Sequence, residues 1–421
     1  MKTRTKQTLL AITIVIGVAG VLISFWQGKQ IDKIIALMDF DGNGMLQIEE
    51  VLPSIRLRFS VLDTDGSGDM DRKEIGSYLR HSIFSGIVRK WHTNGLPEYP
   101  PAGDIDLDAL QVALDEMVEV LELPGAVMLV GKNGVERNRI MSGELDANTV
   151  VPVASASKWV SSVVLMRLVE LDILELDAPL KRYMPKLAEH WANTTLRQLL
   201  SHSSGTGEGH AVENIPSMAY REQFERLIQK PVDNVAGVEF TYGGISMQIA
   251  GYIAEQVSNK PWSQLFDELV GAPSGMEQSA YGHPFWYRTG TVINSPNIAG
   301  GLHTSAQDYF NFLTALYPGV AGVHLLTEDS IGQMESDQTS RLTQNFRPPM
   351  VPNDWFYGLG LWCENPIERR CMLVNSAGAF GTFPWIDRTS GTYGVLITLG
   401  NMPEILPFAL NLRRLAIELE R

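Results

Sequence analysis

The chain has 421 residues, of which 44% are hydrophobic and 19% are charged, and its formal net charge is −14. This length and hydrophobic content are sufficient for a large buried core and for more than one domain. The acidic balance argues against nucleic acid as a partner, because a phosphate backbone is bound through an excess of Lys and Arg.

An apolar run without any charged residue occupies residues 8–26 and follows the basic residues Lys2, Arg4 and Lys6. About nineteen such residues can span a bilayer, and basic flanks stay on the cytoplasmic side. We therefore expect residues 1–28 to form a short cytoplasmic stub and a transmembrane signal anchor, with the remaining chain exported to the periplasm or the cell exterior. A cleaved signal peptide is the alternative, although no clear small-residue cleavage site follows the run.

Two acidic loops, at residues 39–50 and 63–74, fit the twelve-residue calcium loop of the EF-hand. Each loop has glycine at its sixth position and glutamate at its twelfth, a spacing that offers calcium the oxygen ligands it prefers. We expect residues 29–84 to form a small helical EF-hand pair with two Ca²⁺ sites, and Ile48 to pair with Met70 between the loops. Mg²⁺ is an alternative ion. The expected ligands are Asp39, Asp41, Asn43, Met45, Gln47 and Glu50 in the first loop and Asp63, Asp65, Ser67, Asp69, Asp71 and Glu74 in the second.

The remaining chain predicts an α+β domain. A Pro- and Gly-rich stretch within residues 85–104 reads as a linker, and residues 105–121 follow as an amphipathic helix. Two strands, at 125–131 and 135–141, are joined by an Asn-Gly turn that is typical of a hairpin. Further strands at 382–386 and 391–399 and a final helix at 406–420 predict an antiparallel sheet built from both ends of the domain. A helical lobe is expected at about 160–295.

The central chemical feature is Ser155, three residues before Lys158 and next to an apolar helical run at residues 159–171. This spacing places both side chains on one face of a helical turn. A serine hydroxyl needs a neighbouring base to become a nucleophile, and a partly desolvated lysine can be that base. Tyr242 is a candidate for completing the set as a proton relay.

From residue 107 to its end, the chain resembles the class C β-lactamase-like serine hydrolases. This superfamily includes β-lactamases, D-alanyl peptidases, D-amino-acid amidases and family VIII carboxylesterases. The resemblance implies that residues 105–421 adopt the β-lactamase/transpeptidase-like fold, an antiparallel sheet flanked by helices with an inserted helical lobe. It rests on five motifs in the expected order: Ser155-x-x-Lys158, LLSHSSG at 199–205, FTYGG at 240–244, AGGLHTSAQDY at 299–309 and SAGAFG at 376–381.

The resemblance also implies roles for individual residues. Ser155 would attack a carbonyl carbon, and Lys158 and Tyr242 would share its proton. The backbone N–H groups of Ser155 and Ala379 would form the oxyanion hole, and water would release the acyl-enzyme. No cofactor is expected for this chemistry.

Two positions depart from the family pattern. The Asn of the Tyr-x-Asn motif is Gly244, and the Lys or His of the third motif is Ser376. Without a fixed cation on that strand, an uncharged ester or amide fits the site better than a carboxylate-bearing β-lactam. Ser376 could donate a hydrogen bond to the substrate or to the Tyr–Lys pair, or it could be a strand hydroxyl satisfied by the backbone.

The sequence thus favours a membrane-anchored, exported serine hydrolase that acts on a small ester, amide or peptide and carries a calcium-binding module. One alternative is a D-alanyl peptidase or β-lactamase, and another is a non-catalytic, calcium-dependent surface binding protein.

Cys363 and Cys371 flank a predicted hairpin loop, where a disulfide fits an oxidising compartment. His202 and His303 are interpreted as structural hydrogen-bonders and His210 as a loop residue. The oligomeric state is left open.

Overall fold

A computed structural model of the chain describes residues 45–47, 65, 67–75, 106–207, 215, 217–229, 232, 234–283, 293–317, 324–364 and 366–421. The chain divides into two compact units, Met1–Tyr99 and Pro100–Arg421. The division falls inside the predicted linker at 85–104. No helix among the described residues is long and apolar enough to cross a bilayer. The apolar run at 8–26 lies outside those residues.

In the first unit, the two loops predicted to bind calcium meet through a short antiparallel pair, β1 (Leu46–Gln47) and β2 (Asp69–Met70). Leu46 lies opposite Met70 in this pair. The expected pairing of Ile48 with Met70 was therefore wrong. Counted from Asp39, Leu46 is the eighth residue of its loop and Ile48 the tenth, and Met70 is likewise an eighth residue. The two loops thus pair at equivalent positions.

The second unit is built on a seven-stranded antiparallel sheet of order β10-β11-β12-β13-β14-β3-β4. β3, from the start of the unit, pairs with β14 from its end, which confirms a sheet formed from both ends. The β3–β4 turn has Asn133 and Gly134 at φ values of 52° and 79°, the left-handed pair that an Asn-Gly hairpin requires. The strands are β3 (Gly125–Lys132), β4 (Val135–Gly143), β10 (Trp355–Tyr357), β11 (Trp362–Glu364), β12 (Leu373–Asn375), β13 (Phe383–Asp387) and β14 (Thr392–Thr398).

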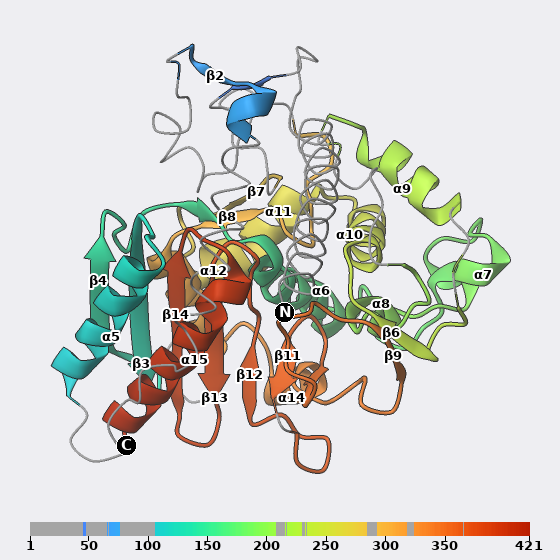
Figure 1. Cartoon of the computed structure of the whole chain (residues 1–421). Helices are drawn as coiled ribbons and strands as arrows, with labels where there is room; N and C mark the ends of the chain where they lie inside the picture. Colours follow the sequence, from blue (N-terminus) through green and yellow to red (C-terminus); the bar gives the residue numbers. More distant parts are fainter. Residues whose placement is uncertain are drawn as a thin grey trace, which may run out of the picture. The chain divides into compact units, whose positions relative to one another are not determined.

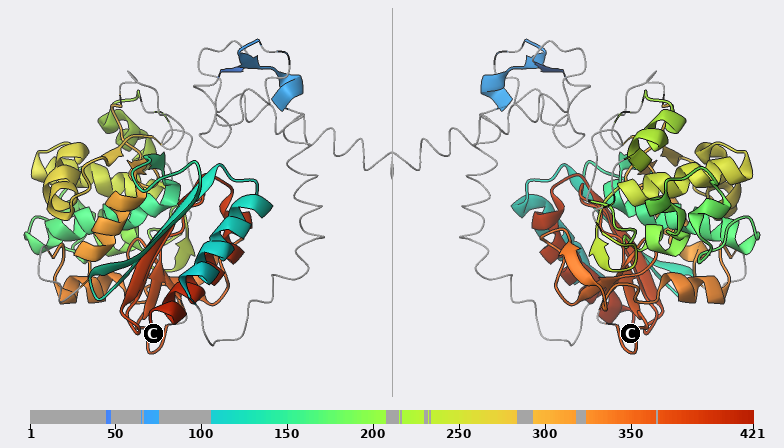
Figure 2. Two further views of the ribbon diagram at one scale, coloured as in Figure 1. Left: turned by 90° about the vertical axis from the view of Figure 1, so that its left-hand side faces the viewer. Right: turned by 90° about the vertical axis from the view of Figure 1, so that its right-hand side faces the viewer.

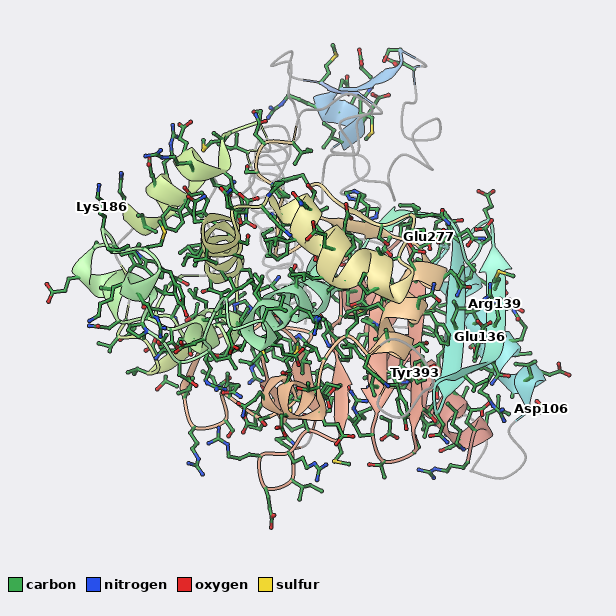
Figure 3. The ribbon with its side chains drawn as sticks, turned by 180° about the vertical axis from the view of Figure 1, so that it is seen from behind. Asp106, Glu136, Arg139, Lys186, Glu277 and Tyr393 are labelled. Atoms are coloured by element: carbon green, nitrogen blue, oxygen red, sulfur yellow. A yellow bond between two sulfur atoms is a disulfide. The ribbon has the colours of Figure 1, made fainter. Side chains whose placement is uncertain are left out.

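Helices α5 (Leu107–Val120) and α15 (Met402–Leu419) cover one face of this sheet, and most of the other helices of the unit lie beyond the opposite face (Figure 2). Asp106, at the start of α5 (Figure 3), caps the helix by accepting a hydrogen bond from the Ala109 amide at 2.9 Å. α15 begins four residues before its predicted start, with a proline in its first turn, where proline is tolerated.

The edge strand β4 carries an ion pair between Glu136 and Arg139, with N–O distances of 2.9 and 3.0 Å (Figure 3). Charged side chains on an exposed edge discourage pairing with another chain.

The helical part of the unit surrounds α6 (Ser157–Glu170), which lies between the sheet and α8 and α10 (Figure 1). α6 is buried around most of its circumference, which explains why its sequence is apolar on more than one side. The other helices are α7 (Glu189–Ala192), α8 (Leu196–Leu200), α9 (Tyr220–Gln229), α10 (Ile245–Ser258), α11 (Trp262–Phe266), α12 (Ala272–Ser274), α13 (Ala306–Ala315) and α14 (Glu328–Met334).

Short strands complete the helical part. β5, β8 and β7 form a three-stranded antiparallel sheet, and β6 and β9 pair in parallel. The strands are β5 (Val151–Pro152), β6 (Glu239–Thr241), β7 (Ala280–Tyr281), β8 (Leu302–Thr304) and β9 (Thr343–Phe346).

Candidate active site

Ser155 lies on a tight turn between β5 and α6. The turn is a single 3₁₀ stretch, Ala154–Ala156, and α6 starts immediately after it. Ala154 has a φ of 46°, a left-handed conformation that is uncommon for a residue with a side chain. The turn places Ser155 just ahead of the N-terminus of α6, where the helix dipole favours negative charge.

The three carbonyl groups of this turn and that of Ser157, the first residue of α6, each accept a hydrogen bond from a side-chain hydroxyl. Rotating the turn would break several of these bonds at once, so the carbonyl groups are held in fixed directions. The pairs are Ser157 Oγ to Ala154 O at 2.6 Å, Ser376 Oγ to Ser155 O at 3.4 Å, Tyr309 OH to Ala156 O at 2.8 Å and Tyr281 OH to Ser157 O at 3.3 Å.

The Lys158 amine contacts the Ser155 hydroxyl directly, with 3.1 Å between Nζ and Oγ. Nζ also donates to the carbonyl oxygen of Ala299 at 2.9 Å. The lysine is 4% exposed, so its amine is almost withdrawn from solvent. Because one hydrogen bond points to the backbone and the other to Ser155, the amine is held in a position that would allow proton exchange with the serine.

Tyr242 follows directly after β6 and presents its ring to the same amine. Lys158 Nζ lies 4.8 Å from the centre of that ring. The ring stacks on Trp362 with centres 5.3 Å apart and meets Tyr357 edge-on at 5.6 Å. Aromatic neighbours on two sides and the backbone bond from the Tyr242 amide to Phe346 O at 3.0 Å fix its position.

The histidines behave differently from the prediction. His202 is 2% exposed, and neither of its ring nitrogens has a hydrogen-bond partner among the described residues. The expectation that its side chain makes a structural hydrogen bond was wrong, because the ring is enclosed by aromatic side chains. Burial, reinforced by the charge of Lys158, holds the pKa of His202 well below its usual range. His303 does form the expected contact, between Nδ1 and Gly301 O at 3.2 Å. His210 lies outside the described residues.

The third-motif segment lies against the Ser155 turn. A Cβ atom on Gly378 would come within 2.0 Å of the Val153 carbonyl oxygen, so only glycine permits this approach. Ala379, the next residue, is exposed, whereas Ser376 is 3% exposed. The Ser376 hydroxyl donates to the Ser155 carbonyl oxygen, a contact that fits the backbone alternative for this residue.

Two links hold β11, the strand that carries Trp362. A disulfide joins Cys363 to Cys371, as expected from their spacing. The Arg413 guanidinium on α15 forms a two-point ion pair with the Glu364 carboxylate, and both side chains are less than 10% exposed. The disulfide closes the β11–β12 hairpin, and the ion pair joins β11 to α15.

Sequence reasoning missed several groups that hold the site. Tyr309 and Ala299 fall inside the AGGLHTSAQDY motif, so the motif could have indicated them. Tyr281 lies outside every motif, and its hydrogen bond to the Ser157 carbonyl had no signal in the sequence.

A separate pocket of about 380 Å³ lies elsewhere in this unit. It shares the disulfide residue Cys371 with the region described above, but neither Ser155, Lys158 nor Tyr242 lines it. Its walls are formed by Tyr317, Glu328, Ile331, Gly332, Glu335, Arg370, Cys371, Met372 and Arg388.

The structure describes part of the second predicted calcium loop. The Glu74 carboxylate accepts hydrogen bonds from the Asp71 amide at 3.0 Å and the Asp65 amide at 3.4 Å, so it is folded back over the loop. The Asp71 carboxylate accepts from the Lys73 and Glu74 amides, both at 2.8 Å. These hard oxygen donors suit calcium. Within the described part of the chain, no three His, Cys, Asp or Glu side chains form a metal-binding group.

The other expected calcium ligands lie partly inside and partly outside the described residues. Met45, Gln47, Ser67 and Asp69 also lie in the described part, and Ser67 Oγ donates to the Asp69 carbonyl at 3.0 Å. Asp39, Asp41, Asn43, Glu50 and Asp63 lie outside it.

Known proteins are similar to this chain in fold and, at about a quarter of the aligned residues, identical in sequence. The protein-family model described as beta-lactamase matches residues 92–416. An uncharacterized protein of Mycobacterium tuberculosis is 25% identical over 354 residues, covering 69% of this chain and 86% of that protein. Esterase EstB of Burkholderia gladioli is 26% identical over 214 residues, covering 43% and 54% of the two chains. The crystal structure of a β-lactamase candidate from Bacteroides dorei superposes with a TM-score of 0.64 at 26% identity, over 73% of this chain and 99% of that one.

Proposed function

The chain belongs to the β-lactamase family, and from this premise we propose that it is a serine hydrolase that cleaves a small ester or amide through an acyl-enzyme on Ser155. The observation that carries the proposal is the 3.1 Å contact between Ser155 Oγ and the Nζ atom of Lys158, a side chain that is almost fully buried. A buried amine beside a serine hydroxyl at the start of a helix is the arrangement that nucleophilic catalysis requires.

In the proposed reaction, Ser155 Oγ attacks the carbonyl carbon while its proton moves to the Lys158–Tyr242 pair. Negative charge develops on the carbonyl oxygen, and the backbone N–H groups of Ser155 and Ala379 stabilise it. The close approach of Gly378 to Val153 O supports this role for Ala379. The pair then returns the proton to the leaving group, and water releases the acyl group from Ser155.

The neutral residue at the third motif supports a substrate without a charge. Ser376 stands where a cation would otherwise attract a substrate carboxylate, and its hydroxyl is already engaged by the backbone. EstB, which aligns with this chain, is named an esterase. We therefore favour an ester or amide without a carboxylate next to the scissile bond.

Turnover of a p-nitrophenyl ester tests this proposal. We expect Ser155→Ala to lose at least about 1,000-fold in kcat while keeping the parent's melting temperature within about 2 °C. Ser142→Ala on β4 is a matched control that should keep full activity. Undiminished turnover by the Ser155 variant would contradict the proposal.

β-Lactam or D-alanyl peptide chemistry is the second candidate, favoured by the family's own description as beta-lactamase. A fluorescent penicillin distinguishes the two. Acylation of Ser155 by the penicillin would support this candidate, and no acylation at high concentration would count against it.

We also propose that the EF-hand pair binds two Ca²⁺ ions. The antiparallel pairing of Leu46 with Met70 and the Glu74 carboxylate folded over its loop support this proposal. Calorimetric titration of the full chain should give two sites, and Glu74→Gln should weaken one of them by at least about tenfold. Heat release that is identical in the parent and the variant would contradict the assignment of Glu74.

Anchoring of residues 1–28 in a membrane, with the catalytic unit exported, remains our proposal from the sequence. Fractionation of cells should recover the chain with membranes, in a form released by detergent but not by high salt. Release by high salt alone would contradict it.

A further inference from the structure

His202 has both ring nitrogens unpaired among the described residues, although it is buried. Its ring centre lies 4.8 Å from that of Tyr242 and 5.0 Å from that of Tyr357. A phenyl ring would fill nearly the same space without leaving polar atoms unpaired. Packing alone therefore does not explain an imidazole here, and such a group next to a reactive site calls for a role in the reaction.

The backbone offers a competing reason for the histidine. His202 has a φ of 53°, a region in which His and Asn are enriched over other residues with side chains. Any test must therefore separate tolerance of this backbone conformation from use of the ring nitrogens.

Lys158 is the group whose charge acts on this ring. A neutral amine, the form that can take up the Ser155 proton, has two N–H donors, and protonation adds a third. The Lys158 amine has two acceptors, the Ser155 hydroxyl and the Ala299 carbonyl. The amine and the centre of the His202 ring both lie 4.8 Å from the centre of the Tyr242 ring. Burial, reinforced by the charge of protonated Lys158, keeps the imidazole neutral, so it retains a lone pair that can accept a hydrogen bond.

We infer that His202 is a positioning residue whose neutral ring accepts a hydrogen bond from the Lys158–Tyr242 pair once that pair holds the Ser155 proton. The inference rests on the proposed function. In this step, the bond from Ser155 Oγ to the carbonyl carbon forms as the O–H bond breaks, and the proton passes to the pair. His202 takes up no proton. The added acceptor orients the pair to return its proton to the leaving group.

Two variants of His202 test the inference in ester turnover. His202→Phe keeps an aromatic ring and removes the nitrogens. We expect its kcat to fall by about tenfold or more, with KM within about twofold, because the lost hydrogen bond exists only after proton transfer. Its melting temperature should not fall by more than about 2 °C, since unpaired nitrogens are removed. A purely structural histidine would not separate kcat from stability in this way.

His202→Asn provides the conservative rescue. Asparagine tolerates positive φ and keeps a hydrogen-bond acceptor, so its kcat should exceed that of the Phe variant. A Phe variant with kcat within twofold of the parent would overturn the inference. If the Phe variant does not fold, the comparison is His202→Asn against His202→Ala, and equal kcat values would overturn it.

Labelling of Ser155 by a fluorophosphonate separates failure of this inference from failure of the proposed serine-hydrolase function. A parent protein that is not labelled would contradict the proposed function. A parent that is labelled and a Phe variant that turns over ester at the parent's rate would contradict the role of His202 alone.

Discussion

Gly378→Ala is the sharpest steric test of the site. The new Cβ atom would stand 2.0 Å from the Val153 carbonyl oxygen, whereas real Cβ contacts essentially never fall below 3.0 Å. The third-motif segment must then move away from the Ser155 turn by at least about 1 Å, the difference between these distances. A displacement of that size in a catalytic constellation costs about 100-fold in rate. The strain should also cost about 1–3 kcal/mol of unfolding free energy.

Gly332→Ala, on α14, is the matched control. A Cβ atom there meets nothing within 4 Å, and alanine is preferred over glycine inside a helix by about 1 kcal/mol. We expect the control to keep kcat within about twofold and to melt slightly higher, and Gly378→Ala to lose about 100-fold in kcat. Ester turnover and thermal unfolding of both variants measure this. A Gly378 variant with kcat near the parent's would refute the close approach as the feature that places Ala379.

Two further predictions concern stability. Arg413→Met leaves the buried Glu364 carboxylate without its charged partner, with the Asn375 amide still donating to it. This change should cost about 3–5 kcal/mol in urea unfolding, whereas the same change at the exposed Arg221 should cost no more than about 0.5 kcal/mol. Equal losses would contradict this. The pKa of His283 is lowered from 6.5 to about 3 by burial and by His303. The unfolded state therefore binds more protons between these values, so stability is present above about pH 6.5 and is lost as the pH falls. At about pH 4.5 this amounts to about 2 kcal/mol relative to pH 7, and His283→Gln should remove most of that difference in thermal unfolding; an unchanged difference would contradict the assignment.

Short sequence patterns correctly predicted the features that involve residues close together in the chain. The Asn133-Gly134 turn predicts the β3–β4 hairpin because few other residues adopt two successive left-handed conformations. The contact between Ser155 and Lys158 follows from their spacing alone. The disulfide between Cys363 and Cys371 follows from two cysteines at the ends of a short hairpin loop.

Long-range contacts could not be read in the same way. Tyr309 reaches the carbonyl of Ala156 across 153 positions of sequence, and no periodicity records such a bond. The enclosure of His202 by aromatic rings depends on strands that meet only in the folded chain, so its unpaired nitrogens had no local signal. The expected pairing of Ile48 with Met70 was wrong because Ile48 is the tenth residue of its loop, whereas Leu46 and Met70 are both eighth residues and lie opposite each other.

The most direct test of the central claim is mass spectrometry of the protein after exposure to a fluorophosphonate and, separately, to a penicillin. The account predicts a fluorophosphonate adduct on the peptide that contains Ser155, no penicillin adduct, and no adduct in the Ser155→Ala variant. Adducts from both reagents would move the chemistry towards cell-wall or β-lactam substrates. The absence of any adduct in a folded parent protein would contradict Ser155 as a nucleophile and favour a surface binding protein.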